Sequence, residues 1–422
     1  MSPRLNHVIE SPARTRLLLG DLGALLLDAG LSVTEVHTRL SQIAASVKAP
    51  VTVSVLPKEV FVADAASGET TTVQAAGTEL SMRQTAIANR LAERVRLGLD
   101  SFADLPELIG DVRRITRRRP DMQMVIGSAL VAAGLAVLFR CPWWAVVTST
   151  IAGLVVGVCV IVIRRVPTSV AILPFVVAFV STSLVGTTAQ VFGLGPVPLY
   201  AVCAPVAVLV PGALITNALL ELTAADVVTG SSRLMYGVIM LGFMAAGISA
   251  GARLTDTRLD ESSARKLTEA PGLTGHLGWQ AHPPTWLSWV GVVFLAVGVG
   301  AAFGAGFRLS AVALAVMTGV YAVLTVLGPV IGDIQATGVI ACIVFAASQA
   351  VERRTPAIPS VAFFFPAFLL LVPGTVGLVA LAASDTNGIA LAVGTFVSLC
   401  IGVKVGEFVS AIGLPSRSGE AP

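Results

Sequence analysis

The stretch "LVPGALITNALLELTAADVVTG" (209–230) lies late in a long apolar run. A Pro-Gly pair stands at 211–212, where a membrane helix would be continuous, and two carboxylates, Glu221 and Asp226, follow. The four letters "LVPG" return at 371–374, again inside an apolar run. The sequence therefore predicts two membrane helices that are broken at matching places.

Composition places the chain among membrane proteins. Hydrophobic residues make up 55% of it and charged residues only 13%, whereas soluble domains carry about 25% charged residues. Residues 1–120 hold 15 of the 28 Lys and Arg and 13 of the 25 Asp and Glu. A polar N-terminal domain is therefore predicted ahead of a membrane domain, and the net charge of +3 indicates no nucleic-acid partner.

The N-terminal residues predict a small α+β domain. Ser32 and Glu35 have the spacing of a capping box and open an amphipathic helix. The alternating and β-rich stretches 51–56, 60–64 and 70–74 predict strands. Further helices are expected around residues 87–95 and 101–116. Nothing in this domain resembles a catalytic or phosphate-binding motif, so an enzyme function is not favoured.

The remaining sequence predicts an α-helical polytopic membrane protein, because a bilayer-crossing helix needs about 20 apolar residues. About ten spans are expected, near 122–139, 143–163, 167–190, 197–220, 234–251, 286–306, 310–328, 334–350, 360–383 and 388–409. Alternate connections are basic, from the arginines at 113–119 to Arg353 and Arg354. The positive-inside rule therefore predicts that both termini are cytoplasmic.

Ten spans divide into five plus five, so the second half enters the membrane from the opposite side, as inverted repeats do. The expected parts are a cytoplasmic α+β domain (1–120), a first five-helix repeat (121–251), an extracytoplasmic loop (252–285), a second repeat (286–410) and a cytoplasmic tail (411–422). Both "LVPG" stretches then fall in the fourth span of their half. Corresponding Pro/Gly breaks in two halves are typical of a midplane substrate site in transporters.

Backbone chemistry explains why a break suits a substrate. Proline removes an amide donor and leaves a carbonyl without its helical partner, and in lipid such groups need another partner. The two half-helix ends present opposite partial charges to the gap, which suit the ammonium and carboxylate of a zwitterion. The alternative, that Pro211 and Pro373 only kink helices for packing, stays open.

At this motif the chain resembles the bacterial threonine/serine exporter family. The pattern consists of Pro-Gly, an Asn, two acids, a Gly and Arg-Leu, here Pro211, Gly212, Asn217, Glu221, Asp226, Gly230, Arg233 and Leu234. The second "LVPG" and the N-terminal stretch "LLLDAGLSVTEVHTRLSQIAASV" (25–47) fit as well. The family more often has Asp where this chain has Glu221. The resemblance implies export of threonine and serine from the cytoplasm across the inner membrane, driven by the proton motive force.

The candidate site residues form two groups. The substrate is expected at the backbone breaks, with Pro211, Gly212, Thr216, Asn217, Pro373, Gly374 and Thr375. Proton coupling or gating is expected from Glu221, Asp226 and Asp333, since ionisable groups within spans are costly and functional by default. Open alternatives are that Glu221 and Asp226 are interfacial or paired with Arg233, and that Asp333 is an ordinary loop residue.

No metal or cofactor motif is found. The five cysteines lie apart in apolar segments, without a CxxC, and are expected to be buried small hydrophobic residues. The expected partners are the amino-acid substrate, protons and the lipid bilayer, and a homo-oligomer is left open. Two other functions stay open: export of a dicarboxylate such as succinate, and a membrane-anchored enzyme or sensor that acts through the N-terminal domain.

Overall fold

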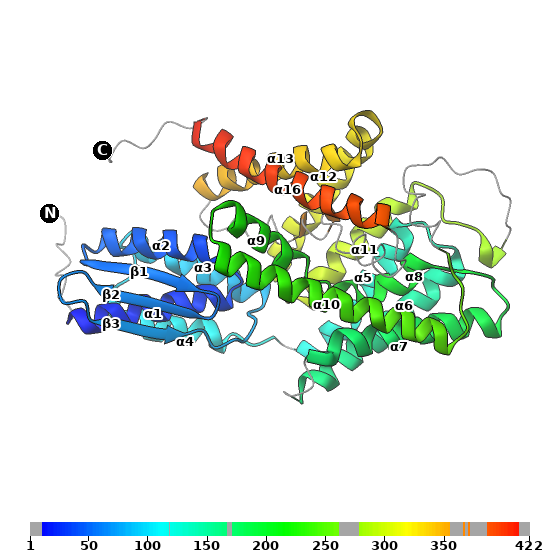
Figure 1. The fold of residues 1–422 in the computed structure, drawn as a ribbon, viewed down its shortest axis with the longest axis horizontal. Helices are drawn as coiled ribbons and strands as arrows, with labels where there is room; N and C mark the ends of the chain where they lie inside the picture. Colours follow the sequence, from blue (N-terminus) through cyan, green and yellow to red (C-terminus); the bar gives the residue numbers. More distant parts are fainter. Residues whose placement is uncertain are drawn as a thin grey trace. The chain divides into compact units, whose positions relative to one another are not determined.

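A computed structural model of the chain describes residues 11–117, 119–166, 171–260, 278–354, 366–367, 370–371 and 386–412. The chain divides into two compact units (Figure 1). Unit 1 consists of Met1–Thr116 together with the short segment Glu221–Gly230, and unit 2 consists of Arg117–Leu220 and Ser231–Pro422. The chain therefore leaves unit 2 for unit 1 at Glu221 and returns at Ser231.

Unit 1 is an α+β fold with one three-stranded antiparallel sheet in the order β1-β2-β3. Its elements are α1 (Pro12–Asp28), α2 (Val33–Ser46), β1 (Val51–Leu56), β2 (Glu59–Asp64), β3 (Thr70–Gln74), α3 (Met82–Arg96), a 3-10 turn (Phe102–Asp104) and α4 (Leu105–Arg114). Strand β2 lies in the middle, with Val53 opposite Val62 and Phe61 opposite Thr72.

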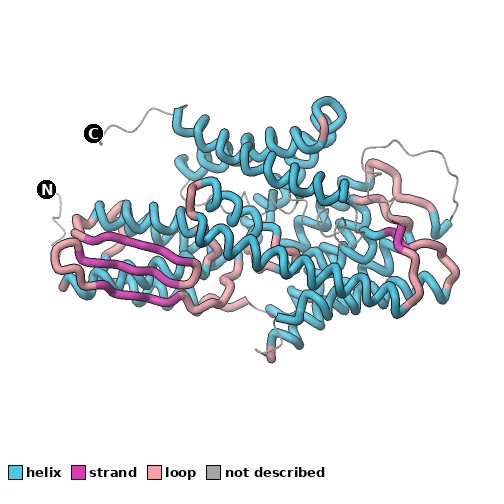
Figure 2. Tube along the Cα trace, viewed as in Figure 1, coloured by secondary structure: helices cyan, strands magenta, loops and turns pink. Residues whose placement is uncertain are grey.

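The core of unit 1 lies between the sheet and helices α1 and α2. Alternate residues of β2, among them Val60 and Val62, are fully buried, as alternation along a half-buried strand requires. Gly20 and Gly23 of α1 let the helix approach the sheet, because a Cβ at Gly23 would lie 3.0 Å from a Val60 methyl carbon. The sheet and its helices are seen in Figure 2, where strands are magenta.

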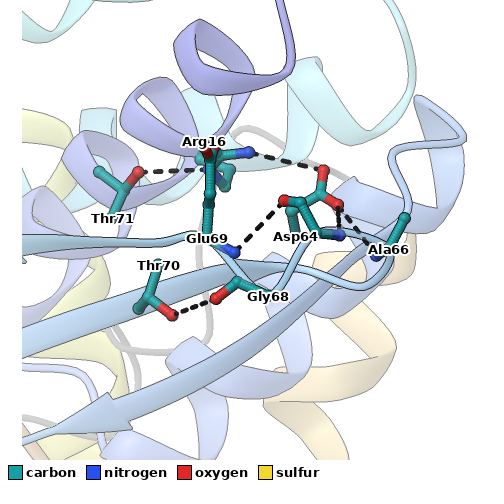
Figure 3. Close-up of polar contacts among 8 residues, drawn as sticks. Arg16, Asp64, Ala66, Gly68, Glu69, Thr70 and Thr71 are labelled. Carbon is teal, nitrogen blue, oxygen red and sulfur yellow. Dashed lines mark hydrogen bonds and ion pairs between the residues drawn. The ribbon is translucent and has the colours of Figure 1, made fainter.

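A buried arginine ties α1 to the end of β2 (Figure 3). Arg16 donates to Glu69 at 2.7 Å and lies 3.5 Å from Asp64. The Asp64 carboxylate also accepts from the backbone amides of Ser67, at 2.8 Å, and Ala66, at 2.9 Å. These amide bonds are the main reason why the pKa of Asp64 lies below its ordinary value. The turn after β2 is therefore held by a charged carboxylate.

Most of the predicted elements of unit 1 are found, with two corrections. The strands agree with 51–56 and 70–74, and β2 begins one residue earlier than predicted. Ser32 does cap α2 by accepting from Glu35 N, but the Glu35 carboxylate pairs with Arg39 at 2.8 Å. The reciprocal capping box is formed in α3, by Ser81 and Gln84. The helix expected at 101–116 is a 3-10 turn followed by α4, because Pro106 starts a new helix.

Unit 2 is almost entirely helical. Its elements are α5 (Pro120–Leu138), α6 (Trp143–Arg164), α7 (Leu173–Val191), β4 (Val197–Pro198), α8 (Leu199–Val206), the 3-10 turn η3 (Ala207–Leu209), α9 (Gly212–Thr223), α10 (Val227–Leu254), β5 (Leu259–Asp260), a 3-10 turn (Gly278–Gln280), α11 (Leu287–Ala302), α12 (Phe307–Ile331), α13 (Asp333–Arg354) and α16 (Thr386–Ile412). Helix α9 ends, and α10 begins, within the segment assigned to unit 1.

Seven helices in the described ranges are long and apolar enough to cross a membrane. They begin at Pro120, Trp143, Leu173, Val227, Phe307, Asp333 and Ala390, and shorter apolar helices cover Leu199–Leu209 and Leu287–Ala302. The structure thus supports a polytopic membrane protein, while ten spans stay a prediction. The ninth predicted span, 360–383, lies almost wholly outside the described residues.

Glycine brings two helices of unit 2 into backbone contact. A Cβ at Gly134 of α5 would lie 2.6 Å from Leu295 N, and one at Gly127 would lie 2.5 Å from Ala302 N. The contact is reciprocal, since a Cβ at Gly291 of α11 would lie 2.8 Å from the Gly134 carbonyl. Real Cβ atoms essentially never come that close, so only glycine fits at these positions.

Candidate functional site at the broken fourth span

The fourth predicted span begins with a short helix that is wholly enclosed. All eight residues of α8, from Leu199 to Val206, are buried. Pro205 lies inside this helix and has no N–H to donate to the carbonyl of Ala201, four residues earlier. The Ser149 hydroxyl of α6 donates to that carbonyl at 2.7 Å and is itself fully buried. A neighbouring helix thus supplies the hydrogen bond that proline removes.

A second hydroxyl supports the same helix. Ser181 of α7 donates to the carbonyl of Val202 at 3.0 Å, and Ser181 is fully buried. Thr182 and Thr188 of α7 instead bond to carbonyls of their own helix. The hydroxyls at these three positions of the stretch 181–190 therefore bond to backbone carbonyls.

The helix is interrupted where the sequence predicts it. Val210 has extended backbone angles, φ −63° and ψ 123°, between η3 and α9. Its amide donates to the Ala207 carbonyl at 3.2 Å, which is the carbonyl that loses its helical partner to Pro211. Pro211 is buried, while Val210 and Gly212 are half-buried. The break thus lies inside the protein and remains partly accessible.

Helix α9 restarts directly after Pro211, which is well suited to a helix start. Its first helical hydrogen bond runs from Ile215 N to the Pro211 carbonyl at 3.0 Å. Ahead of Ile215, the Gly212 amide donates to the Val210 carbonyl at 2.8 Å, and the amides of Ala213 and Leu214 precede the first helical hydrogen bond. Thr216 and Asn217 follow one turn later, and Asn217 is half-buried. The break therefore joins the carbonyl end of one helix to the amide end of the next.

Helix α9 ends in a tight turn that leads into α10. The Glu221 carbonyl accepts from Asp226 N at 2.9 Å, and the Leu222 carbonyl accepts from Ala225 N at 3.1 Å. This pair of bonds is a Schellman motif, which needs a left-handed residue. That residue is Ala225, with φ 65°, where glycine is usual. The turn thus carries a conformational cost.

The two acids of this turn make contacts inside unit 1. The Glu221 side chain is 1% exposed, and its Oε1 accepts from the backbone amide of Val33 at 2.9 Å. Thr34 Oγ1 lies 3.4 Å from Asp226 Oδ2 and donates to it. Both contacts fall on the first turn of α2. The sequence places Glu221 and Asp226 together, but it gives no sign of a partner 188 positions away.

The other candidate residues lie apart from this turn. Asp333 is exposed and opens α13, next to Gly332 with φ 86°. Elsewhere, Lys404 and Glu407 form an ion pair at 3.1 Å on the surface of α16. Pro373, Gly374 and Thr375 lie outside the described residues, as does the side chain of Thr216.

The described residues contain no cluster of three or more His, Cys, Asp or Glu that could hold a metal ion. Cys141, Cys203 and Cys400 are buried and Cys159 and Cys342 half-buried, and all five are free thiols. Sequence reasoning missed Ser149 and Pro205. A proline four residues after a buried carbonyl was the available signal, but the sequence does not reveal which neighbouring hydroxyl answers it.

Seven long apolar helices within the described residues, with a shorter buried helix that is interrupted before Pro211 and Gly212, define a multi-pass membrane protein. The chain belongs to the ThrE family, described as "Putative threonine/serine exporter", whose model matches residues 18–255, more than half of the chain. No curated protein and no solved structure matches the chain. The family description is that of a transporter, so the chain is placed with membrane exporters of the threonine/serine type and not with enzymes.

Proposed function

We propose that this protein exports threonine and serine from the cytoplasm across the bacterial inner membrane, driven by the proton motive force, with the substrate bound at the broken fourth span. The observation that carries the proposal is the interruption at Val210 and Pro211, because it lies within the residues that match the exporter family. Discontinuous helices are the usual place of substrate binding in secondary transporters.

The chemistry of the break fits a small zwitterion. The end of η3 offers backbone carbonyls to an ammonium group, and the start of α9 offers backbone amides to a carboxylate. Asn217 lies just over one turn into α9, and its side-chain amide both donates and accepts hydrogen bonds. A substrate hydroxyl would find there a partner for either role. Thr216 and the second break, Pro373 to Thr375, complete the proposed site.

Matched glycines support the proposal that the two halves are inverted repeats. Gly127 and Gly134 of α5 pack against Gly291 and Gly298 of α11, and 164 residues separate both Gly127 from Gly291 and Gly134 from Gly298. Because Gly127 meets Gly298 while Gly134 meets Gly291, the two helices run antiparallel. Equivalent helices that pack antiparallel and reciprocally are what a two-fold axis between the halves requires.

A second pair of contacts agrees with this relation. In the first half, Gly247 and Gly251 of α10 pack on the backbone of α7. In the second half, Gly402 and Gly406 of α16 pack on the backbone of α13. In both cases the fifth helix of the half meets the third through two glycines four residues apart. Such small-residue contacts let membrane helices approach closely.

The topology is part of the proposal. Residues 1–120 and the tail 411–422 are placed in the cytoplasm, with repeats at 121–251 and 286–410 and an exported loop at 252–285. The support is the positive-inside pattern of the connections. Asp333 would then lie at the outer end of its span, where a gating carboxylate is a reasonable role for it.

Efflux from proteoliposomes tests the function. Vesicles are loaded with labelled threonine, serine or succinate, and loss of label is followed with and without an imposed pH gradient. We expect gradient-dependent loss of threonine and serine, slowed in Asn217→Ala and unchanged in Thr150→Val, whose hydroxyl bonds only within α6. Loss of succinate alone would assign the protein to dicarboxylate export, and retention of all three would refute the proposal.

A further inference from the structure

We propose that Glu221 and Asp226 are gating residues that fasten the end of α9 to helix α2, so that unit 1 controls the broken span. The inference rests on the proposed export function. The chain of contacts is short, because α9 begins at the break and its last turn already belongs to unit 1. A change at α2 would therefore reach the proposed substrate site through the hydrogen bond to Glu221 and then along α9 itself.

The contact of Glu221 with α2 is a short, buried hydrogen bond. Its carboxylate oxygen and the Val33 amide lie 2.9 Å apart, and both residues are almost fully buried. Val33 is the first residue of α2, so its amide is one of those that the helix leaves without an acceptor. The Ser32 hydroxyl accepts from Glu35 N, two amides further on, and not from Val33 N. A residue from a distant part of the chain thus completes the cap of α2.

The position of the two acids at the start of α2 is also electrostatically favourable. The amino end of a helix carries a partial positive charge and favours nearby carboxylates. Glu221 and Asp226 both meet this end, through the Val33 amide and the Thr34 hydroxyl. Two acids on one helix start give a contact that is both directional and charge-assisted. That role needs a carboxylate to accept a hydrogen bond and does not need it to carry a proton across the membrane.

The two halves differ in the number of residues that follow the break. Between the break and the glycine pair of the fifth helix, the first half has seven more residues than the second, since Pro211 lies 36 residues before Gly247 and Pro373 lies 29 before Gly402. The extra length falls in the interval that holds Glu221–Gly230, the segment that belongs to unit 1. The halves thus differ where the connection to unit 1 is made.

A proline substitution can break the contact selectively. Val33→Pro removes the amide that Glu221 accepts from, and proline is well tolerated at the first position of a helix. Ser32, with φ −67° and ψ 151°, already has the conformation that precedes proline. The matched control is Met82→Pro, at the first position of α3 after Ser81, with φ −66° and ψ 156°. Both variants place proline at the first position of a helix, and Val33→Pro removes the amide that donates to Glu221.

The Glu221 variants separate gating from proton transfer. Glu221→Gln keeps an oxygen that accepts from Val33, whereas Glu221→Ala removes it. In the reconstituted full-length protein we expect threonine efflux altered several-fold in Val33→Pro and Glu221→Ala. Met82→Pro should keep wild-type efflux. Glu221→Gln should be closer to the wild type than Glu221→Ala and should keep the wild-type pH profile. Efflux as defective in Glu221→Gln as in Glu221→Ala, with loss of pH dependence, would make Glu221 the proton carrier and overturn the proposal.

A second measurement does not depend on transport. Hydrogen exchange in the first turn of α2 should be about tenfold faster in Glu221→Ala than in the wild type, as expected for loss of a hydrogen bond to a charged group. The exchange rate in Glu221→Gln should be intermediate, because the glutamine keeps the accepting oxygen and loses the charge. Unchanged exchange would overturn the contact itself. Wild-type protein that shows this exchange effect but exports neither amino acid would refute the export function and leave the contact standing.

Discussion

The α5–α11 contact and the fourth predicted span differ in how their helix backbones are used. Between α5 and α11, continuous helices with glycine at Gly127, Gly134, Gly291 and Gly298 let the two backbones touch, and no side chain fits between them. In the fourth span the helix itself is interrupted, and Ser149 and Ser181 replace part of the lost or weakened backbone bonding. The first region maximises packing, and the second exposes backbone groups to chemistry. That difference is the reason why we propose the fourth predicted span as the place for a substrate.

The largest effect is expected from alanine in the glycine contact. Gly134→Ala places a methyl group against the backbone of Leu295, which should destabilise the protein by about 1–3 kcal/mol or more, as overpacking does. Gly291→Ala should cost a similar amount, because the contact is reciprocal. Thermal unfolding in detergent, followed by size-exclusion chromatography, measures both variants.

The matched controls are Gly242→Ala in α10 and Gly319→Ala in α12. Nothing lies within 4 Å of a Cβ at either position, so both should be neutral or stabilising by roughly 0.5–1 kcal/mol. If Gly134→Ala and Gly242→Ala have the same unfolding temperature, the backbones of α5 and α11 are not in contact.

The next effect concerns the hydroxyl that answers Pro205. Ser149→Ala leaves the buried Ala201 carbonyl without its donor, which should cost about 1–3 kcal/mol. In a Pro205→Ala background the helix regains an amide for that carbonyl, so Ser149→Ala should cost clearly less. A double-mutant cycle on thermal stability measures the difference. Equal costs in both backgrounds would show that the Ser149 hydroxyl does not compensate for the hydrogen bond that Pro205 removes from the Ala201 carbonyl.

A smaller gain is expected in the turn after α9. Ala225 has φ 65°, a left-handed conformation that costs alanine roughly 1–2 kcal/mol. Ala225→Gly removes this strain, but the gain is only partial because glycine has more freedom in the unfolded chain. The net gain should be below about 1 kcal/mol. Ala224→Gly, one residue earlier, is the control and should not stabilise. Stabilisation by both would mean that the left-handed turn is not the cause.

The smallest effect is confined to acidic pH and to unit 1. The backbone amides of Ser67 and Ala66 lower the pKa of Asp64, so its contribution to stability is present above the ordinary value of 3.8 and is lost as pH falls through the lowered pKa. Brief pepsin digestion between pH 5 and pH 2 should show cleavage of wild-type β2 and β3 rising through this range. In Asp64→Asn, cleavage of β2 and β3 should rise less steeply as the pH falls. Cleavage within α5 and α11 should be the same in the variant and the wild type. A variant that follows the wild-type profile would exclude Asp64 as the titrating group.

Sequence patterns predicted the parts of the fold that depend on local preference. Strict alternation located β1, and Pro-Gly located the break at Val210 and Pro211. The sequence could not predict the partners that lie far away in the chain. The contact of Glu221 with Val33, and of Ser149 with Ala201, depends on tertiary folding alone. The capping box was expected at Ser32, because Glu35 has the right spacing, but Arg39 competes for its carboxylate.

Substrate protection at the break tests the central claim most directly. Val210→Cys places a thiol at the interruption, and Leu99→Cys places one in the exposed loop after α3. The rate of maleimide modification at each site is measured by mass spectrometry with increasing threonine. We expect a saturable slowing at Val210→Cys and none at Leu99→Cys. Equal rates at Val210→Cys with and without threonine, in protein that exports threonine, would place the substrate elsewhere.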